Sequence, residues 1–283
     1  TCSDTAAAIG GSQIWLEPGE IMSVEELVKA AAVVSANDAC GALAEYISGS
    51  QSAFVADMNK RAKELGMENT QFKDCSGLDD TGRSTAHDVA VMSRELMKHK
   101  DIQKFTTIWM DSLRGGASQL VNTNKLLRHY KGATGLKTGT TSAAGHCLSA
   151  TAQRDGTAYV AVVLGCGDDD SRFARAEELL DYGFESFEKF SPEVDSAKLL
   201  PISVERGTVE SVQPIVKNSG GICIIKKGRA ADVEYEYTFV ESLEAPVKQG
   251  QFLGEYLVAV DGAAVMRTDI IAAKDVDRIS FWY

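Results

Sequence analysis

The first part of the chain repeats apolar and polar positions with the period of an amphipathic helix. Ser23 followed by Glu26 is a capping box, and the apolar residues that come next recur at helical spacing. Residues 35–38 then bring together a serine, an asparagine and an aspartate, which favour caps and turns, so this helix should end there and another should begin. Ser35 and Asn37 are therefore predicted to lie at a junction between two helices.

Two more amphipathic helices are expected downstream of this junction. One covers about residues 50–66 and ends at the C-cap candidate Gly66, and the other follows Ser84. The apolar residues of the second helix that should face inward are Val89, Met92 and Leu96. The first hundred residues are therefore predicted to be mainly helical.

Beyond about residue 132 the pattern changes to that of strands. Residues 135–141, 147–152 and 158–164 are each typical of a strand, and Asp155-Gly156 between the last two is a strong hairpin signal. Because the third run is apolar on both faces, we expect it to be the central, buried strand. A helix with one apolar stripe follows and would pack on this sheet. The stripe consists of Phe173, Ala176, Leu180, Phe184 and Phe187.

The last third of the chain has the pattern of an all-β domain. Residues 232–239 alternate strictly between apolar and polar, which indicates a half-buried strand. Other short apolar runs are separated by glycine-containing turn signals. We therefore predict two domains, covering residues 1–195 and 196–283, with the second a small β-sandwich.

Composition excludes several classes of function. The chain of 283 residues carries a net charge of −11 with a pI near 4.9, which disfavours binding to nucleic acid because a phosphate backbone requires clustered Lys and Arg. The six cysteines form no C-x-x-C pair and have no histidine at ligand spacing, so we assign no metal site, no cofactor and no disulfide.

Two tripeptides carry candidate chemistry. Ser35-Ala36-Asn37 lies at the predicted helix junction, and Lys137-Thr138-Gly139 lies on a predicted strand about a hundred residues later. Each is weak alone, since such triplets arise by chance and a lone Lys-Thr-Gly is usually a solvated strand edge. Their order and settings together match the second and third elements of penicillin-recognising serine enzymes, which use Ser-x-x-Lys, Ser-x-Asn and Lys-Thr-Gly.

The resemblance to low-molecular-mass penicillin-binding proteins, the serine D-alanyl-D-alanine carboxypeptidases, extends along essentially the whole chain. It includes residues 11–20, 35–39, 77–86, 137–145, 250–254 and 275–282. This resemblance implies an α/β (α+β) transpeptidase/β-lactamase-like domain, followed by a small all-β sandwich domain.

The Ser-x-x-Lys element that carries the nucleophile is missing from its expected place. In the resembling family it precedes the segment similar to residues 1–20, so we expect it upstream of residue 1 and treat the catalytic domain as truncated at its N-terminus. The match at Ser186 to Lys189 follows Lys-Thr-Gly, and we interpret it as chance. The chain alone is therefore expected to be inactive.

By resemblance, Ser35 and Lys137 are the catalytic residues of this chain. Ser35 resembles the hydroxyl that relays a proton to the departing D-alanine, and Lys137 supplies positive charge beside the catalytic hydroxyls. Asn37 resembles the amide that hydrogen-bonds the substrate peptide. Simple helix capping is the alternative reading of Ser35 and Asn37.

Four further residues are expected to bind substrate. Thr138 would offer a hydroxyl to the terminal carboxylate, Gly139 would let the strand backbone approach the ligand, and the Thr140 amide would form half of an oxyanion hole. Arg172 aligns with a family arginine near the carboxylate pocket, although a helix-surface charge is an equally good interpretation. The histidines are scattered and predict no Ser-His-Asp set.

The function implied by the resemblance is removal of the terminal D-Ala from peptidoglycan stem pentapeptides through an acyl-enzyme, with β-lactam antibiotics trapping that intermediate. Such proteins act outside the cytoplasm in the bacterial cell envelope, and many end in an amphipathic membrane helix, which here would come after Tyr283. Two alternatives are a non-catalytic peptidoglycan-binding protein, which would suit the missing nucleophile, and a class A-like β-lactamase. The β-lactamase is disfavoured by the second domain and by the lack of a recognisable deacylating Glu.

Overall fold

The computed structural model describes residues 1–280 and divides the chain into two compact units, Thr1–Phe184 and Glu185–Tyr283. The predicted boundary lay later, between residues 195 and 196. The second unit begins earlier because residues 187–190 form a strand that pairs with residues 223–226 of that unit. No helix of the described residues is both long and apolar enough to span a lipid bilayer.

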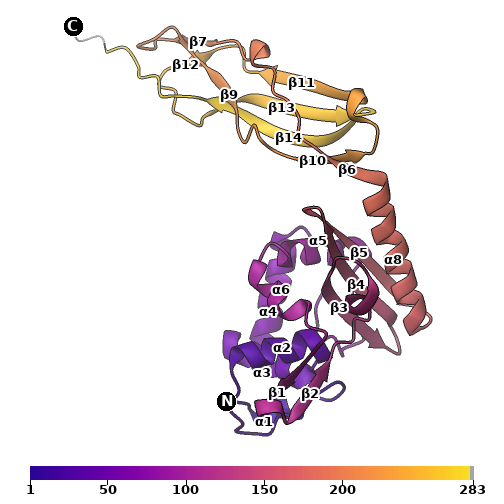
Figure 1. Cartoon of the computed structure of the whole chain (residues 1–283). Coiled ribbons are helices and arrows are strands. Elements are labelled where there is room, and N and C mark those ends of the chain that lie inside the picture. The colour runs from indigo at the N-terminus through magenta and orange to yellow at the C-terminus, as the bar shows by residue number, and fades with distance from the viewer. Residues whose placement is uncertain (281–283) are drawn as a thin grey trace. The chain divides into compact units, whose positions relative to one another are not determined.

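The first unit begins with helices and continues into a small sheet that a long helix covers (Figure 1). Its helices are α1 (Asp4–Ala7), α2 (Val24–Val34), α3 (Asn37–Ser48), α4 (Gln51–Glu64), α5 (Ala86–Leu96), α6 (Gln103–Thr106), α7 (Leu126–His129) and α8 (Asp169–Ser186). Its strands are β1 (Met110–Leu113), β2 (Ser118–Val121), β3 (Ala133–Thr141), β4 (Gly145–Arg154) and β5 (Thr157–Cys166).

The helix junction predicted around Ser35 is confirmed. Helix α2 begins at the reciprocal capping box of Ser23 and Glu26. It ends at Ser35, which adopts the left-handed conformation with φ 60°, and α3 begins two residues later at Asn37. The left-handed residue reverses the chain so that α3 packs against α2. The Ser-x-Asn triplet is thereby held on a sharp turn between two packed helices.

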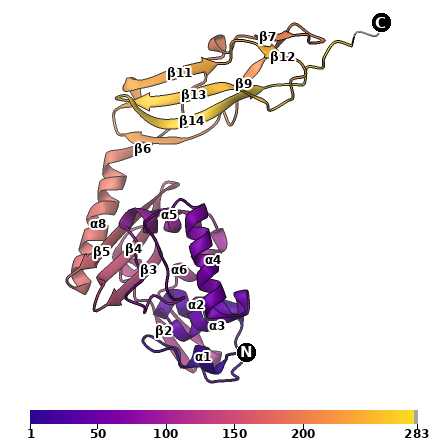
Figure 2. The same cartoon turned by 180° about the vertical axis from the view of Figure 1, so that it is seen from behind.

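The three-stranded sheet has the predicted strands but not the predicted order. Strand β4 lies in the centre and pairs antiparallel with β3 and β5, and Asp155 and Gly156 form the turn between β4 and β5 with positive φ. The expectation that residues 158–164 form the central strand is therefore wrong. Strand β5 is an edge strand that is apolar on both sides because α8 packs on one face of the sheet and α5 on the other (Figures 1 and 2).

The inward face of α5 also differs from the prediction. Met92 and Leu96 are 36% and 37% exposed, whereas the buried residues of the helix are Asp88 and Ser93. Ser93 shares a hydrogen bond of 2.7 Å with Ser149 of β4, so a polar contact joins α5 to the sheet. Apolar periodicity alone could not reveal this, because the helix is anchored by hydroxyl and carboxylate groups.

The second unit is built from two sheets that share a core, as expected for a β-sandwich. One sheet has the order β11-β13-β14-β9 and the other β12-β7-β8, while β6 and β10 form a separate pair. The strands are β6 (Phe187–Phe190), β7 (Ile202–Glu205), β8 (Ser211–Val212), β9 (Pro214–Val216), β10 (Cys223–Lys226), β11 (Val233–Phe239), β12 (Leu243–Glu244), β13 (Phe252–Val260) and β14 (Ala263–Ala272). Phe187, predicted to lie on the helix stripe, begins β6 instead.

Candidate active site

A direct hydrogen bond joins the two sequence motifs. The Lys137 ammonium donates to the Ser35 hydroxyl at 2.7 Å and to the Thr138 carbonyl at 2.6 Å. Lys137 lies in β3, while Ser35 ends α2, so two elements that are far apart in sequence meet at this point. The pairing of these two predicted catalytic residues is the centre of the candidate site.

Burial and charge set the protonation states around Lys137. Burial lowers the pKa of Lys137 to about 8, and the Arg172 guanidinium adds to this shift while the neighbouring Cys40 opposes it. Burial likewise raises the pKa of the Cys40 thiol to about 11. At neutral pH the site therefore holds a lysine ammonium beside a neutral thiol and a serine hydroxyl.

Asn37 lies beside Ser35 but is largely buried. Its side-chain amide donates to the Gly10 carbonyl at 2.9 Å, and its backbone N–H donates to the Ser12 carbonyl at 2.7 Å. The next residue, Asp38, is fully buried and accepts hydrogen bonds from the backbone amides of Ile14 and Leu16. The residues after Ser35 thus tie the segment of residues 10–16 to the start of α3. The helix-capping interpretation of Asn37 is wrong, because the N-cap of α3 is Ala36 and no side chain caps it.

The Thr138 hydroxyl is buried and hydrogen-bonds to the Thr123 hydroxyl at 2.6 Å. Two hydroxyls carry two protons, and only one is used between them, so the other is left for an external acceptor. Thr123 is the exposed member of the pair. The sequence did not predict a role for Thr123, because the Asn-Thr-Asn pattern of residues 122–124 does not indicate a contact with β3.

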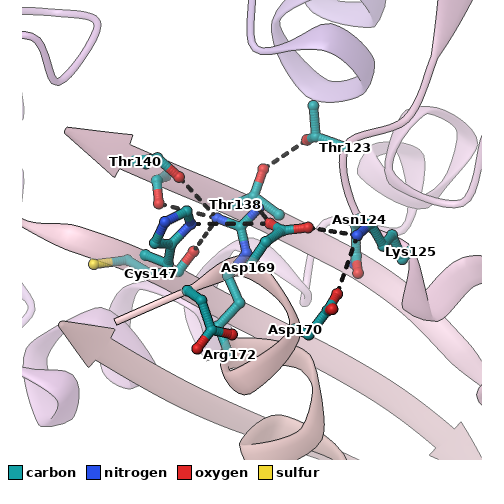
Figure 3. Close-up of polar contacts among 12 residues, drawn as sticks. Thr123, Asn124, Lys125, Thr138, Thr140, Cys147, Asp169, Asp170 and Arg172 are labelled. Atoms are coloured by element: carbon teal, nitrogen blue, oxygen red, sulfur yellow. Dashed lines mark hydrogen bonds and ion pairs between the residues drawn. The ribbon is translucent and has the colours of Figure 1, made fainter. Parts of the chain in front are cut away.

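Gly139 and Thr140 are exposed on β3, and Arg172 lies beneath them. Arg172 is only 5% exposed, so the interpretation of it as a helix-surface charge is wrong. Its Nη1 donates to the Gly139 carbonyl at 3.1 Å, to the Thr140 hydroxyl at 3.0 Å and to the Cys147 carbonyl at 3.2 Å (Figure 3). Arg172 therefore fixes the end of β3 that carries Lys-Thr-Gly and joins it to β4 through hydrogen bonds.

Two of the histidines and the Ser-x-x-Lys match lie apart from this site, whereas His146 approaches Asp169 at 4.0 Å. His129 contacts Glu177 and His87 contacts Asp88, so these histidines lie apart from Ser35. Ser186 closes α8, and the lysine three residues later belongs to β6 of the second unit. Within residues 1–280, no cluster of His, Cys, Asp and Glu could hold a metal ion, and all six cysteines are free thiols.

Comparison with known proteins identifies the family. Residues 1–168 match the family model described as D-alanyl-D-alanine carboxypeptidase, and residues 187–278 match the one described as penicillin-binding protein 5, C-terminal domain. The chain belongs to the D-alanyl-D-alanine carboxypeptidase family. It is a low-molecular-mass penicillin-binding protein with the penicillin-recognising fold and a C-terminal β-sheet domain, as its sequence predicted.

Two of the following three relatives are similar over nearly the whole chain. D-alanyl-D-alanine carboxypeptidase DacF of Bacillus subtilis is 38% identical over 283 residues, covering 99% of this chain and 73% of the relative. The structure of penicillin-binding protein 5 from Haemophilus influenzae has a TM-score of 0.85 and 29% identity, covering 98% of this chain and 82% of that one. Penicillin-binding protein D2 from Listeria monocytogenes, in the ampicillin-bound form, has a TM-score of 0.57 and 35% identity, covering 62% and 74%.

Proposed function

We propose that Ser35, Lys137 and their neighbours form the working part of a serine D-alanyl-D-alanine carboxypeptidase site. The observation that carries this assignment is the hydrogen bond from the Lys137 ammonium to the Ser35 hydroxyl. The reaction also needs a nucleophilic serine with its own lysine, which we expect outside these 283 residues. The family model and the named relatives favour this function over a β-lactamase or a non-catalytic peptidoglycan-binding protein.

In this mechanism the nucleophilic serine oxygen attacks the carbonyl of the penultimate D-alanine and forms an ester. The amide bond to the last D-alanine breaks, and the departing amine takes a proton through the Ser35 hydroxyl. The positive charge of Lys137 lies next to Ser35. It stabilises the negative charge that develops on the Ser35 oxygen while the proton is transferred. Water then hydrolyses the ester, which releases the shortened peptide and restores the serine.

The substrate contacts that we propose centre on β3. The hydroxyl pair of Thr138 and Thr123 has one proton to offer to the terminal carboxylate of the peptide, and Arg172 adds positive charge nearby. In this proposal the Asn37 amide beside Ser35 orients the peptide, and Gly139 has no side chain to block its approach. The Thr140 N–H serves as one donor of the oxyanion hole.

We further propose that the protein acts on peptidoglycan stem pentapeptides outside the cytoplasm, either as a secreted protein or as a peripheral protein on the outer face of the cytoplasmic membrane. Peptidoglycan-processing relatives and the cell-wall chemistry of the family support this location. We also propose that a β-lactam binds at this site, and the ampicillin-bound form of the Listeria relative supports β-lactam binding in the family.

A form of the enzyme that includes the nucleophilic serine should release D-alanine from a peptide ending in D-Ala-D-Ala and should form a one-to-one adduct with a labelled penicillin. The 283-residue chain should form no such adduct, because the Ser-x-x-Lys element that carries the nucleophilic serine is missing from its expected place before Ser35. Intact-mass spectrometry measures the adduct on each of the two forms, and an assay of free D-alanine measures its release. A stoichiometric adduct on the 283-residue chain would reveal a nucleophile within it, and no D-alanine release by the longer form would refute the proposed function.

The pH dependence of the reaction should report the ionisation of Lys137. Since the proposed role requires the ammonium and its pKa is lowered to about 8, kcat/KM should fall as pH rises through about 8. In Lys137→Arg the guanidinium stays charged, so any remaining activity should persist well above that pH. A profile that rises through pH 8 instead would mean that the neutral amine is the active form.

A further inference from the structure

A carboxylate outside the two motifs connects the elements that brace β3. Asp169, at the start of α8, forms an ion pair with Arg172 and another with Lys125 at 2.6 Å (Figure 3). Burial alone would raise the pKa of Asp169, but the hydrogen bond from Lys125 and the charge of Arg172 outweigh it and hold that pKa below its usual range. Asp169 is therefore ionised and bridges two cations at neutral pH.

Arg172, one partner of Asp169, contacts the two residues joined by the Gly139–Thr140 peptide bond. Arg172 donates to the Gly139 carbonyl and to the Thr140 hydroxyl. In a planar trans peptide the C=O of one residue and the N–H of the next point in opposite directions. Holding the Gly139 carbonyl toward Arg172 therefore directs the Thr140 N–H away from it.

Lys125, the other partner of Asp169, belongs to the segment that contacts Thr138. Lys125 lies two residues after Thr123, whose hydroxyl bonds to that of Thr138, and the Thr123 backbone N–H is fixed to the Val33 carbonyl at 3.1 Å. The segment that supports Thr138 and the helix that supports Gly139 and Thr140 come from different parts of the chain. Asp169 is the side chain that touches a cation from each of them.

We propose that Asp169 is a positioning residue for the carboxypeptidase reaction, acting through Arg172 and Lys125 to hold the Thr138–Thr140 peptides in the geometry that binds the transition state. This inference rests on the proposed role of the Thr140 N–H as an oxyanion donor. It assigns a role to a residue that lies just beyond residues 1–168, the part matched by the carboxypeptidase model. Asp169 touches no substrate in this account.

The test replaces Asp169 by Asn in an active form of the enzyme that includes the nucleophilic serine. An amide has only one acceptor oxygen and turns N–H donors toward its other neighbour, so it cannot bridge two cations. We expect kcat to fall roughly tenfold to a hundredfold with KM changed by less than about threefold, because the loss is in the transition state. Rates are divided by the number of sites that a labelled penicillin titrates, which removes any loss of folded protein.

Asp170→Asn is the matched control. Asp170 also approaches the Lys125 ammonium, at 3.4 Å, but its side chain is 94% exposed and none of its ion pairs reaches Arg172. It should keep wild-type kcat. If Asp169→Asn does not fold, Lys125→Met is the second test. The Lys125 side chain is half exposed, so its replacement should be tolerated, and loss of its ion pair with Asp169 should also lower kcat.

Two results would overturn the proposal. One is a wild-type kcat per titrated site in Asp169→Asn, even with a lowered melting temperature, which would make the bridge purely structural. The other is an equal loss in Asp169→Asn and Asp170→Asn, which would make it a general effect of surface charge. Failure of the wild-type enzyme to release D-alanine is a separate outcome, because it would refute the proposed function and not the role of Asp169.

Discussion

Replacing Lys137 by alanine in an active form of the enzyme should lower kcat/KM by at least roughly a hundredfold, equivalent to about 2.7 kcal/mol. The ammonium is the hydrogen-bond donor to the Ser35 hydroxyl in this structure, at 2.7 Å. Its removal leaves Ser35 without the adjacent positive charge that supports proton relay, and it also removes charge near the substrate carboxylate. The measurement is steady-state hydrolysis of a peptide ending in D-Ala-D-Ala.

Lys131→Ala is a suitable control for this experiment. Lys131 is exposed, precedes the same strand and uses its backbone carbonyl to accept from Arg154. Its replacement should leave kcat/KM unchanged within about twofold, as expected for a surface charge. Near-wild-type hydrolysis by Lys137→Ala would remove Lys137 from the mechanism and leave the Ser35 contact as a structural one.

Local signals in the sequence were enough to predict the parts of the site that depend on nearby residues. The capping box at Ser23 and the turn-forming residues at 35–38 predicted the helix junction, because both act over a few residues of backbone. The Lys-Thr-Gly strand and the Asp155-Gly156 turn were predictable for the same reason. The family resemblance then indicated that Ser35 and Lys137 work together.

Contacts between distant segments could not be predicted in this way. An apolar run such as residues 158–164 has the same pattern in a central strand and in an edge strand covered by helices on both faces. The hydroxyl pair of Thr123 and Thr138 joins residues 15 positions apart, and the ion pair of Asp169 with Lys125 joins residues 44 positions apart. No local pattern marks such polar contacts, since they depend on how the elements pack.

The 283-residue polypeptide should self-associate in solution. Within the described part of the chain no strand pairs with the outer edge of β5, whose run of β-branched and aromatic residues favours pairing with another strand. An apolar cavity of about 330 Å³ also opens between α4 and α5. Residues that line it include Phe54, Met58, Leu65, Phe72 and Met92. We expect light-scattering chromatography to show oligomers or aggregate rather than a sharp monomer peak.

Leu164→Lys should reduce this association, because a charge on an edge strand opposes pairing with a second chain. Leu164 is 41% exposed at the end of β5, so lysine can reach solvent without leaving a cavity. Val209→Lys is the matched control, since Val209 is 43% exposed and lies outside the strands of the second unit. We expect the association constant to fall on the order of tenfold in Leu164→Lys alone. A monomeric wild-type chain with cooperative unfolding of its first unit would show that the open edge of β5 is tolerated, and equal loss in both variants would place the contact elsewhere.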